Sequence, residues 1–445
     1  MDTPVKNHKV YNVALDEFNR RNKISEKVRE RFSRIIPEPY YHKHPFYVKS
    51  GKGCIIIDVD GNERIDYLNA WSVLILGHAH PKVVKLVRNE IENGATYRLP
   101  DIYEIELAEE ISRRMSAAEM VEYATTGTEA VQIALRLARI HTRRKKIVMF
   151  DTSYHGVSDS VYFPGTFDWE KIGTEDPSGR LEEGRKYAIL IPYNDLEIVE
   201  KVVKENKNEI AAIIVEPFLH IGAVPPKENF HKGIREITAK NDILMIFDEV
   251  LTGPRFRGGA HGLYNIKPDI VTLGKAVGGG YANFGAVAGS SEIMELFRKG
   301  KVLSMGTFRA HRMAMVAGLT TLKELTSPAY DHLNSTGRAI REGIQKAATE
   351  ADIKVQVTGI GSFFNVFFID QKVDNLKAER KADMGLRRLF DLLLWNRGVF
   401  IFPSHHSNVS LPVRDEHVKL TLKAVEQSLA DMKPLIEELR PDLIL

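Results

Sequence analysis

The sequence contains a single cysteine, Cys54, among its 445 residues. One thiol excludes an intramolecular disulfide and any cysteine-based metal cluster. The chain also has no run approaching the roughly 20 consecutive apolar residues of a membrane helix. Its polar first residues lack the apolar core of a secretory signal. We therefore expect a soluble cytoplasmic protein.

A strong excess of one charge is missing as well. The 62 basic and 59 acidic side chains leave a formal net charge of +3. This balance gives no reason to expect nucleic acid or a membrane surface as a partner. Hydrophobic residues make up 43% and charged residues 27% of the chain, which is typical of an ordinary globular protein.

Short strand-like runs alternate with helical patterns through the middle of the chain. The runs lie at 120–125, 146–151, 187–193, 210–217, 243–250 and 269–274. Helical periodicity separates several of them, most clearly in GTEAVQIALRLARIHTRR at 127–144. This alternation predicts an α/β fold with a largely parallel sheet whose two faces are covered by helices. Ligands of such sheets bind beyond the carboxyl ends of the strands.

The two ends of the chain do not show this regular alternation of strands and helices. Residues 54–68 read as a hairpin with the turn DGNE, and residues 14–34 as an exposed helix or arm. After about residue 310, helical and strand-like stretches suggest a smaller α+β domain. We predict three parts: an N-terminal segment that packs with the small domain (1–75), a large domain (76–312) and a C-terminal small domain (313–445).

Three polar features stand at the predicted carboxyl ends of core strands. TTGTEAVQIAL at 125–135 opens a helix, whose first N–H groups suit a phosphate, although a threonine there is more often only an N-cap. Asp248 and Glu249 end an apolar run, and Lys275 ends the next one. Each of these could also be a solvated strand end.

Together the three features match one cofactor. Pyridoxal phosphate needs a lysine for its Schiff base, an acid at its pyridinium nitrogen and a phosphate cradle. Lys275, Asp248 and the turn at 125–128 supply these groups. The acid keeps the ring an electron acceptor, and the lysine amine can shuttle a proton. His405 and His406 are adjacent and would point to opposite faces of a strand, so we predict no metal site.

The chain resembles a known family. The segment FDEVLTGPRFRGGAHGLYNIKPDIVTLGKAVGGG (247–280) is similar to the signature of class III aminotransferases, which are pyridoxal-phosphate enzymes of fold type I. ATTGTEAVQIALRLAR, TSYHGVSDS, IIVEP and MGTF also look like family segments, in the family's order. The subgroup that it most resembles joins glutamate-1-semialdehyde aminomutase with the β-amino-acid aminotransferases.

This resemblance implies roles for individual residues. Lys275 would form the Schiff base and Asp248 would pair with the pyridine nitrogen. The remaining cofactor contacts would come from both ring faces and the phosphate, namely Val250, Tyr154, Gly127 and Thr128. Thr307 would reach the phosphate of a neighbouring subunit, so the resemblance implies an obligate homodimer with active sites at the interface. Trp71, Ser72 and Glu216 would line the substrate side.

The sequence also departs from the family pattern. Residues 161–184 do not resemble the glycine- and serine-rich gating loop of the aminomutases, and loss of a lid argues against that activity. Arginines expected to hold substrate carboxylates are missing before the hairpin and before the last strand. Substitutes are available in the substrate candidates Arg309 and Arg312 and in Lys43 and His405. A substrate without a carboxylate is the other interpretation.

Two enzyme classes follow from these residues. The leading hypothesis is transamination, in which an amino donor and a keto acid, aldehyde or ketone acceptor react in a ping-pong cycle. The alternative is an isomerase on the same scaffold, either an aminomutase of the glutamate-1-semialdehyde type or an amino-acid racemase. A binding protein without activity would have no use for Lys275 beside Asp248.

Overall fold

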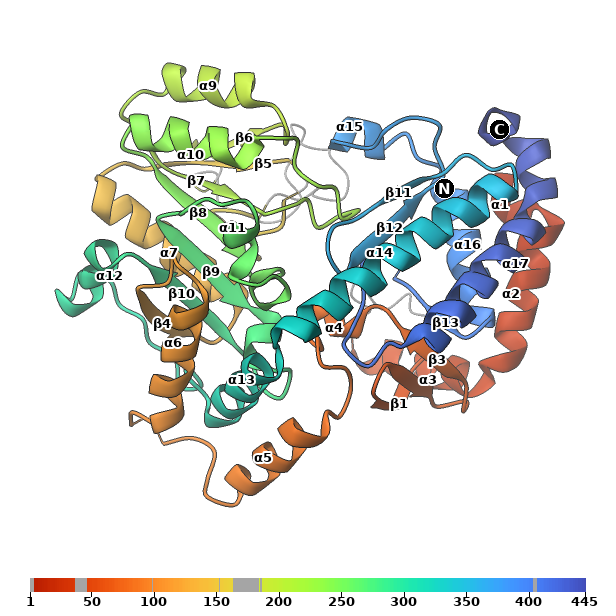
Figure 1. Cartoon of the computed structure of the whole chain (residues 1–445), viewed down its shortest axis with the longest axis horizontal. Helices are drawn as coiled ribbons and strands as arrows, with labels where there is room; N and C mark the ends of the chain where they lie inside the picture. The colour runs from red at the N-terminus through yellow and green to blue at the C-terminus, as the bar shows by residue number, and fades with distance from the viewer. Residues whose placement is uncertain are drawn as a thin grey trace.

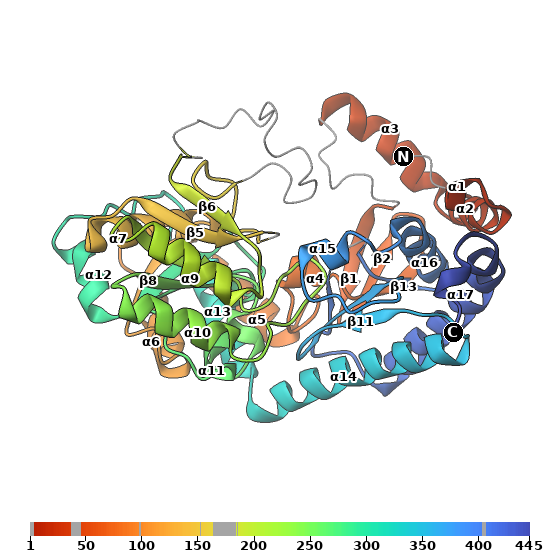
Figure 2. The same ribbon diagram turned by 90° about the horizontal axis from the view of Figure 1, so that it is seen from above.

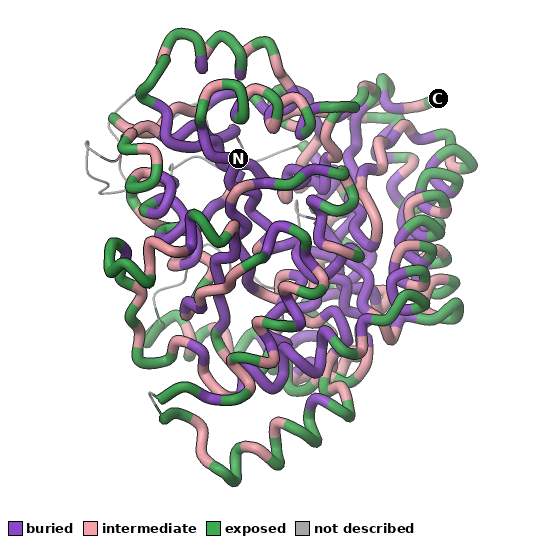
Figure 3. The backbone as a smooth tube through the Cα atoms, turned by 60° about the vertical axis from the view of Figure 1, so that its left-hand side comes forward, coloured by how far each residue is buried: buried purple, intermediate pink, exposed green. Residues whose placement is uncertain are grey.

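The computed structural model describes residues 4–36, 46–97, 99–151, 153–162, 184, 186–402 and 406–445. Figure 1 shows a large sheet with its helices in one half of the molecule and smaller sheets with long helices in the other half. In Figure 3 the buried residues run through the interior of the molecule, while the exposed ones lie mostly along its outer edge.

The large half is built on a seven-stranded sheet with the order β4-β10-β9-β8-β7-β5-β6. Its strands are β4 (Met120–Ala124), β5 (Lys146–Phe150), β6 (Ala188–Ile191), β7 (Ile210–Val215), β8 (Leu244–Glu249), β9 (Ile270–Gly274) and β10 (Gly285–Gly289). The strands β9, β8, β7, β5 and β6 run parallel, and β10 is antiparallel to both of its neighbours. The predicted α/β fold with a mostly parallel sheet is confirmed.

Helices cover both faces of this sheet because its central strands are apolar on both sides. Along β7, Ile213 and Val215 pack with α9 (Leu196–Glu205) and α10 (Phe230–Lys240). The alternate residues Ala212 and Ile214 pack with α7 (Gly127–Thr142) and α12 (Ser291–Arg298) on the opposite face. Three further helices belong to this half, namely α6 (Ile102–Arg114), α11 (Gly259–Leu263) and α13 (Arg312–Glu324).

The other half contains two small sheets. One has the order β1-β2-β3-β13 and the other β11-β12-β14. Their strands are β1 (Val48–Lys52), β2 (Ile55–Asp58), β3 (Glu63–Asp66), β11 (Gln356–Thr358), β12 (Phe363–Phe367), β13 (Val399–Phe400) and β14 (Ser407–Asn408). The hairpin predicted at 54–68 is present, since β2 pairs with β3 in antiparallel fashion.

The two ends of the chain meet in this half, as Figure 1 shows. Its helices are α1 (Pro4–Asn7), α2 (Lys9–Arg21), α3 (Lys23–Ile35), α14 (Ser327–Glu350), α15 (Leu376–Glu379), α16 (Met384–Asn396) and α17 (Asp415–Leu439). The helix α2 packs on α16, where the rings of Phe18 and Trp395 lie 6.0 Å apart. The exposed helix predicted at 14–34 is two helices, and its first part is wrong because α2 buries Ala14 and Phe18. The helix α3, drawn away from the sheets in Figure 2, buries only Ser25 and is the exposed part.

The halves are joined by α4 (Asn69–Ser72) and the start of α14, while α5 (Pro81–Ile91) packs on α13 in the large half. None of the helices in the described ranges is long and apolar enough to span a membrane.

Candidate active site

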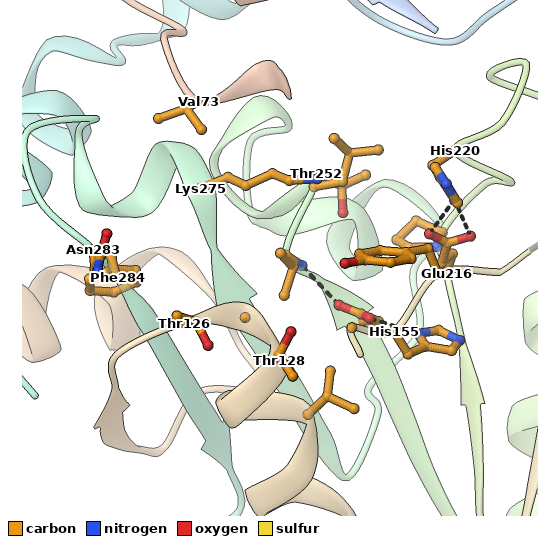
Figure 4. Close-up of a pocket in the computed structure, with 18 of the residues that line it drawn as sticks. Val73, Thr126, Thr128, His155, Glu216, His220, Thr252, Lys275, Asn283 and Phe284 are labelled. Atoms are coloured by element: carbon orange, nitrogen blue, oxygen red, sulfur yellow. Dashed lines mark hydrogen bonds and ion pairs between the residues drawn. The ribbon is translucent and has the colours of Figure 1, made fainter. Parts of the chain in front are cut away.

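A cavity of about 350 Å³ opens where β7, β8 and β9 end and α7 begins. Its lining includes the glycine- and threonine-rich turn at 125–128, the carboxylates of Glu216 and Asp248, and Lys275. Figure 4 shows Thr126 and Thr128 at one side of this space, Glu216 and His220 at another, and the side chain of Lys275 at a third, near Thr252. The three polar features predicted from the sequence therefore come together at one edge of the sheet.

Lys275 reaches the cavity because it follows directly after β9, every residue of which is buried. It begins the short 3-10 helix η4 (Lys275–Gly278) with a φ of 45°. Burial lowers the pKa of its amine, and the nearby carboxylates of Asp248 and Glu216 oppose that shift. The glycines that follow allow close packing, since a Cβ on Gly279 would lie 2.5 Å from the backbone of Ala317. A buried lysine of reduced basicity is suited to forming and breaking bonds to carbon.

Asp248 lies at the end of β8 in a complete set of hydrogen bonds. Its Oδ2 accepts from Nδ1 of His155 at 2.7 Å, and its Oδ1 accepts from Oγ1 of Thr272 at 2.8 Å and from the backbone of Val250 at 3.1 Å. Burial alone would raise the pKa of this carboxyl. The hydrogen bond and charge of His155 and the bond from Thr272 outweigh burial and hold the pKa below its usual range. Asp248 is therefore an ionised carboxylate in a buried place.

The first turn of α7 supplies a cradle for an anion. Thr126 is the N-cap, and its hydroxyl accepts from the N–H of Glu129 at 3.2 Å, so this threonine does serve as the helix cap. The N–H groups of the first turn have no acceptor within their own helix and can bind a phosphate. Gly127 permits the approach of this turn to the cavity, because a Cβ there would lie 2.9 Å from Cγ1 of Val250.

These groups fit pyridoxal phosphate. A helix N-terminus for the phosphate, an ionised carboxylate for the ring nitrogen and a buried amine line the same cavity. Tyr154 and Val250, which the resemblance assigns to the two ring faces, line it too. The donor set therefore matches each part of that cofactor. Among the described residues no group of three His, Cys, Asp or Glu side chains could hold a metal ion.

Glu216 and His220 form the remaining polar wall. Glu216 follows β7, and its Oε1 lies 2.9 Å from Nδ1 of His220. Burial raises the pKa of Glu216 to about 8. Burial, together with the charge of Lys275, lowers the pKa of His220 to about 3.

Trp71 and Ser72, which the resemblance assigns to the substrate side, are not among the residues that line the cavity. Residues 69–72 form a left-handed turn, with φ values of 49°, 51°, 58° and 70°. The ring of Trp71 packs on Phe402 at 4.5 Å, and the hydroxyl of Ser72 bonds to Nε2 of His406 at 3.2 Å. Val73, which follows the turn, is the residue of this segment that lines the cavity.

Thr307, Arg309 and Arg312 lie away from Lys275. They line a second, smaller hollow together with Tyr97 and Leu99. Arg309 bonds to Glu122, and Arg312 bonds to Glu90 at 2.6 Å and to Asp101. Both arginines are thus paired with acids of the same chain.

Sequence reasoning missed three partners of the site. His155 stands beside Tyr154 in the segment TSYHG, so its motif was visible, but its bond to Asp248 was not. Thr272 lies opposite Asp248 on the neighbouring strand β9. This contact could have been predicted only if the register of β8 and β9 had been known. His220 had no signal in the sequence. Lys43, His405 and most of the segment 161–184 lie outside the described residues.

Comparisons with known proteins agree with this geometry. The family model "Aminotransferase class-III" matches residues 37–429. A protein of Methanocaldococcus jannaschii named glutamate-1-semialdehyde 2,1-aminomutase is 40% identical over 395 residues, which cover 88% of this chain and 92% of that protein. An ω-transaminase from Sphaerobacter thermophilus has a similar structure, with a TM-score of 0.84, 31% identity, and coverage of 92% of this chain and 97% of the other. A glutamate-1-semialdehyde aminomutase from Pseudomonas aeruginosa superposes with a TM-score of 0.86 at 25% identity, covering 96% and 98% of the two chains.

Proposed function

We propose, from the premise that this chain belongs to the class III aminotransferase family and uses pyridoxal 5′-phosphate, that it exchanges an amino group and a carbonyl oxygen between adjacent carbons of one substrate. The enzyme would then be an aminomutase, an isomerase of the glutamate-1-semialdehyde type. The observation that carries this proposal is the 40% identity, over 88% of the chain, to a protein named as such an aminomutase. This was the second of the two hypotheses that the sequence suggested.

Transamination between two substrates is the second candidate. It is supported by the 31% identity to an ω-transaminase of the same fold. The cavity supports it as well. Its described lining contains no arginine to hold a substrate carboxylate, which suits a transaminase substrate that has no carboxylate. Both candidates use the same cofactor and differ in whether one substrate or two complete the cycle.

The residues of the cavity divide the work. Bound pyridoxal phosphate supplies an electron sink for breaking a bond next to nitrogen. The first turn of α7, with Gly127 and Thr128, binds the phosphate, while Tyr154 and Val250 enclose the ring. Asp248, ionised and fixed by His155, holds a proton on the ring nitrogen. Lys275, whose burial lowers the pKa of its amine, would remove and return the proton of the substrate carbon that carries the nitrogen.

A second copy of the chain completes the proposed enzyme. Thr307 lies outside the cavity that contains Lys275, so it can serve a phosphate only in a neighbouring subunit. Several large apolar side chains near it are exposed in one chain, namely Tyr97, Leu99, Ile102, Leu303, Met305 and Phe308. An exposed apolar patch of this kind is typical of a subunit interface. We therefore expect a cytoplasmic homodimer, and light scattering during size-exclusion chromatography would measure its mass.

One experiment separates the two candidate activities. The purified enzyme would be incubated with a single substrate, glutamate-1-semialdehyde, and the products separated by chromatography. An aminomutase converts it, without a second substrate, to an isomer of the same composition in which the amine and the carbonyl have changed places. A transaminase needs an added amino donor or acceptor and releases a product that has gained or lost an amino group. Turnover only in the presence of both partners would replace the aminomutase proposal by transamination.

A further inference from the structure

Three arginines are buried in the described part of the chain, and one of them has no acid beside it. Arg64 pairs with Asp58, and Arg387 pairs with Asp391 at 2.7 Å. Arg255 is 0% exposed and forms no ion pair with any described residue. Because an arginine is almost never fully buried unless it is paired, this unpaired charge needs an explanation.

The hydrogen bonds of Arg255 all go to neutral oxygen atoms. Nη1 donates to Oγ of Ser362 at 3.3 Å and to the carbonyl oxygen of Val409 at 3.1 Å, and Nη2 donates to the carbonyl oxygen of Ser72 at 3.0 Å. The guanidinium also lies over the ring of Phe363, 5.2 Å from its centre. Its Nε is buried and has no partner among the described residues. These contacts fix the group in place but leave its positive charge uncompensated.

The two acids that precede Arg255 in the same segment are committed elsewhere. Glu249 accepts from Nδ1 of His261 at 2.6 Å and from the backbone N–H groups of Ala260 and His261 at 2.6 Å and 3.0 Å. Asp248 is bonded as described above, and its charge is matched by the proton that it holds on the ring nitrogen. Burial lowers the pKa of Arg255 to about 9, so the guanidinium is still charged at neutral pH.

Arg255 lies directly behind the wall of the cavity. Its acceptor Ser72 precedes Val73, and Thr252 is the N-cap of the short 3-10 helix that ends at Arg255. Val73 and Thr252 both line the cavity. Figure 4 shows these two residues on the side of Lys275, away from the threonines of the phosphate cradle. The unpaired charge therefore lies behind the part of the cavity that is left for a substrate, and not behind the phosphate.

We propose that Arg255 draws a carboxylate group of the substrate into this cavity without touching it. The inference rests on the proposed function, because it concerns the substrate of the same site. One uncompensated positive charge matches a single negative charge, and in a protein interior such a charge still acts over several ångströms. Arg255 is thus a positioning residue. A cavity whose described lining contains no arginine can still favour an anionic substrate over a neutral one.

The test compares two ligands that differ in charge alone. Pentanoate and pentanamide have nearly the same size and shape, and neither has a group that reacts with the cofactor. Calorimetric titration of the holoenzyme at neutral pH should show about tenfold tighter binding of pentanoate. Arg255→Met should bind the two ligands equally, whereas a merely structural role would change both affinities alike and keep their ratio. A wild type that does not prefer pentanoate, or an unchanged ratio in Arg255→Met, would overturn the proposal.

A matched pair of variants at Ser362 tests the charge while Arg255 stays in place. Ser362→Asp puts a carboxylate where the hydroxyl accepts from Nη1, and so gives Arg255 the counter-ion that it lacks. The preference for pentanoate should then disappear. Ser362→Asn has nearly the same size without the charge, and it should keep the preference. The same result in both variants would overturn the proposal.

The Ser362 pair decides alone if Arg255→Met does not fold, which thermal unfolding would show. None of these measurements involves turnover. A failure of the aminomutase assay and a failure of the preference for pentanoate are therefore separate results.

Discussion

Nδ1 of His155 lies 2.7 Å from Oδ2 of Asp248, and both side chains are buried. Nε2 of the same imidazole is also buried and has no partner within the described part of the chain. The bond explains how a carboxylate stays ionised where burial favours the neutral acid. Asp248 and His155 should therefore behave as one unit.

Replacement of His155 by leucine should weaken the cofactor and slow the reaction together. Without the donor, the pKa of Asp248 rises and its carboxylate no longer holds the ring proton at neutral pH. We expect cofactor affinity and kcat each to fall by about tenfold to a hundredfold. Fluorescence titration with pyridoxal phosphate and steady-state rates would measure both. His141→Leu, at the exposed end of α7, is the control, and a His155→Leu enzyme with normal affinity would contradict the assignment.

Replacement of Lys275 by alanine should abolish turnover without harming the fold. Loss of the amine removes the proton carrier, so we expect a fall in kcat of at least about a thousandfold. The cofactor-free protein should be no less stable, because a buried amine that burial makes less basic is itself costly. Lys267→Ala, which removes an exposed lysine paired with Glu119, should leave the rate unchanged. Steady-state rates and thermal unfolding would be measured for both variants. Retained activity in Lys275→Ala would contradict the assignment of this lysine as the proton carrier.

The strands predicted from apolar runs were the most reliable of the predictions made from the sequence. All six predicted core strands are present, because β-branched and aliphatic runs bounded by polar residues have few other structures available. The strand β10 was missed since its sequence, GAVAG, has little intrinsic strand preference and forms through burial between β4 and β9. Asp248 and Lys275 could be predicted because Asp248 lies at the end of one buried run and Lys275 directly follows another. Their partners could not, since His155 and His220 are brought to them only by the three-dimensional arrangement.

Arg309 and Arg312 should not be the substrate-binding cations. Arg312 already bonds to Glu90 and Asp101, and Arg309 to Glu122. We expect Arg309→Met and Arg312→Met to change KM by less than about threefold. Arg312→Met should also lower the free energy of unfolding by about 2 kcal/mol, because it leaves two acids without their partner. Substrate titrations and denaturant unfolding would measure these effects. A rise in KM of about tenfold or more in either variant would restore the arginines as carboxylate ligands across the dimer interface.

The left-handed turn at 69–72 stores backbone strain. Ala70 has a φ of 51° and a ψ of 52°, which costs a residue with a Cβ about 1 kcal/mol relative to glycine. Ala70→Gly should therefore stabilise the protein by up to that amount. Ala108→Gly, in the regular helix α6, should destabilise it by about 1 kcal/mol. Denaturant unfolding of the two variants gives opposite signs if the turn is strained, and the same sign if it is not.

His231 should make the protein lose stability in mild acid. The imidazole is buried against aromatic rings, and its Nε2 donates to the carbonyl of Pro217 at 2.8 Å. Burial lowers its pKa from the ordinary 6.5 to about 4. The unfolded chain therefore takes up a proton below pH 6.5 that the folded chain refuses until about pH 4. The free energy of unfolding falls across this window as the pH drops, by about 3 kcal/mol for this one group. His231→Gln keeps a donor for Pro217 but does not titrate, so its unfolding curve should be flatter between pH 6.5 and 4 by about that amount. Parallel curves for His231→Gln and the wild type in urea titrations would show that His231 is protonated in the folded protein.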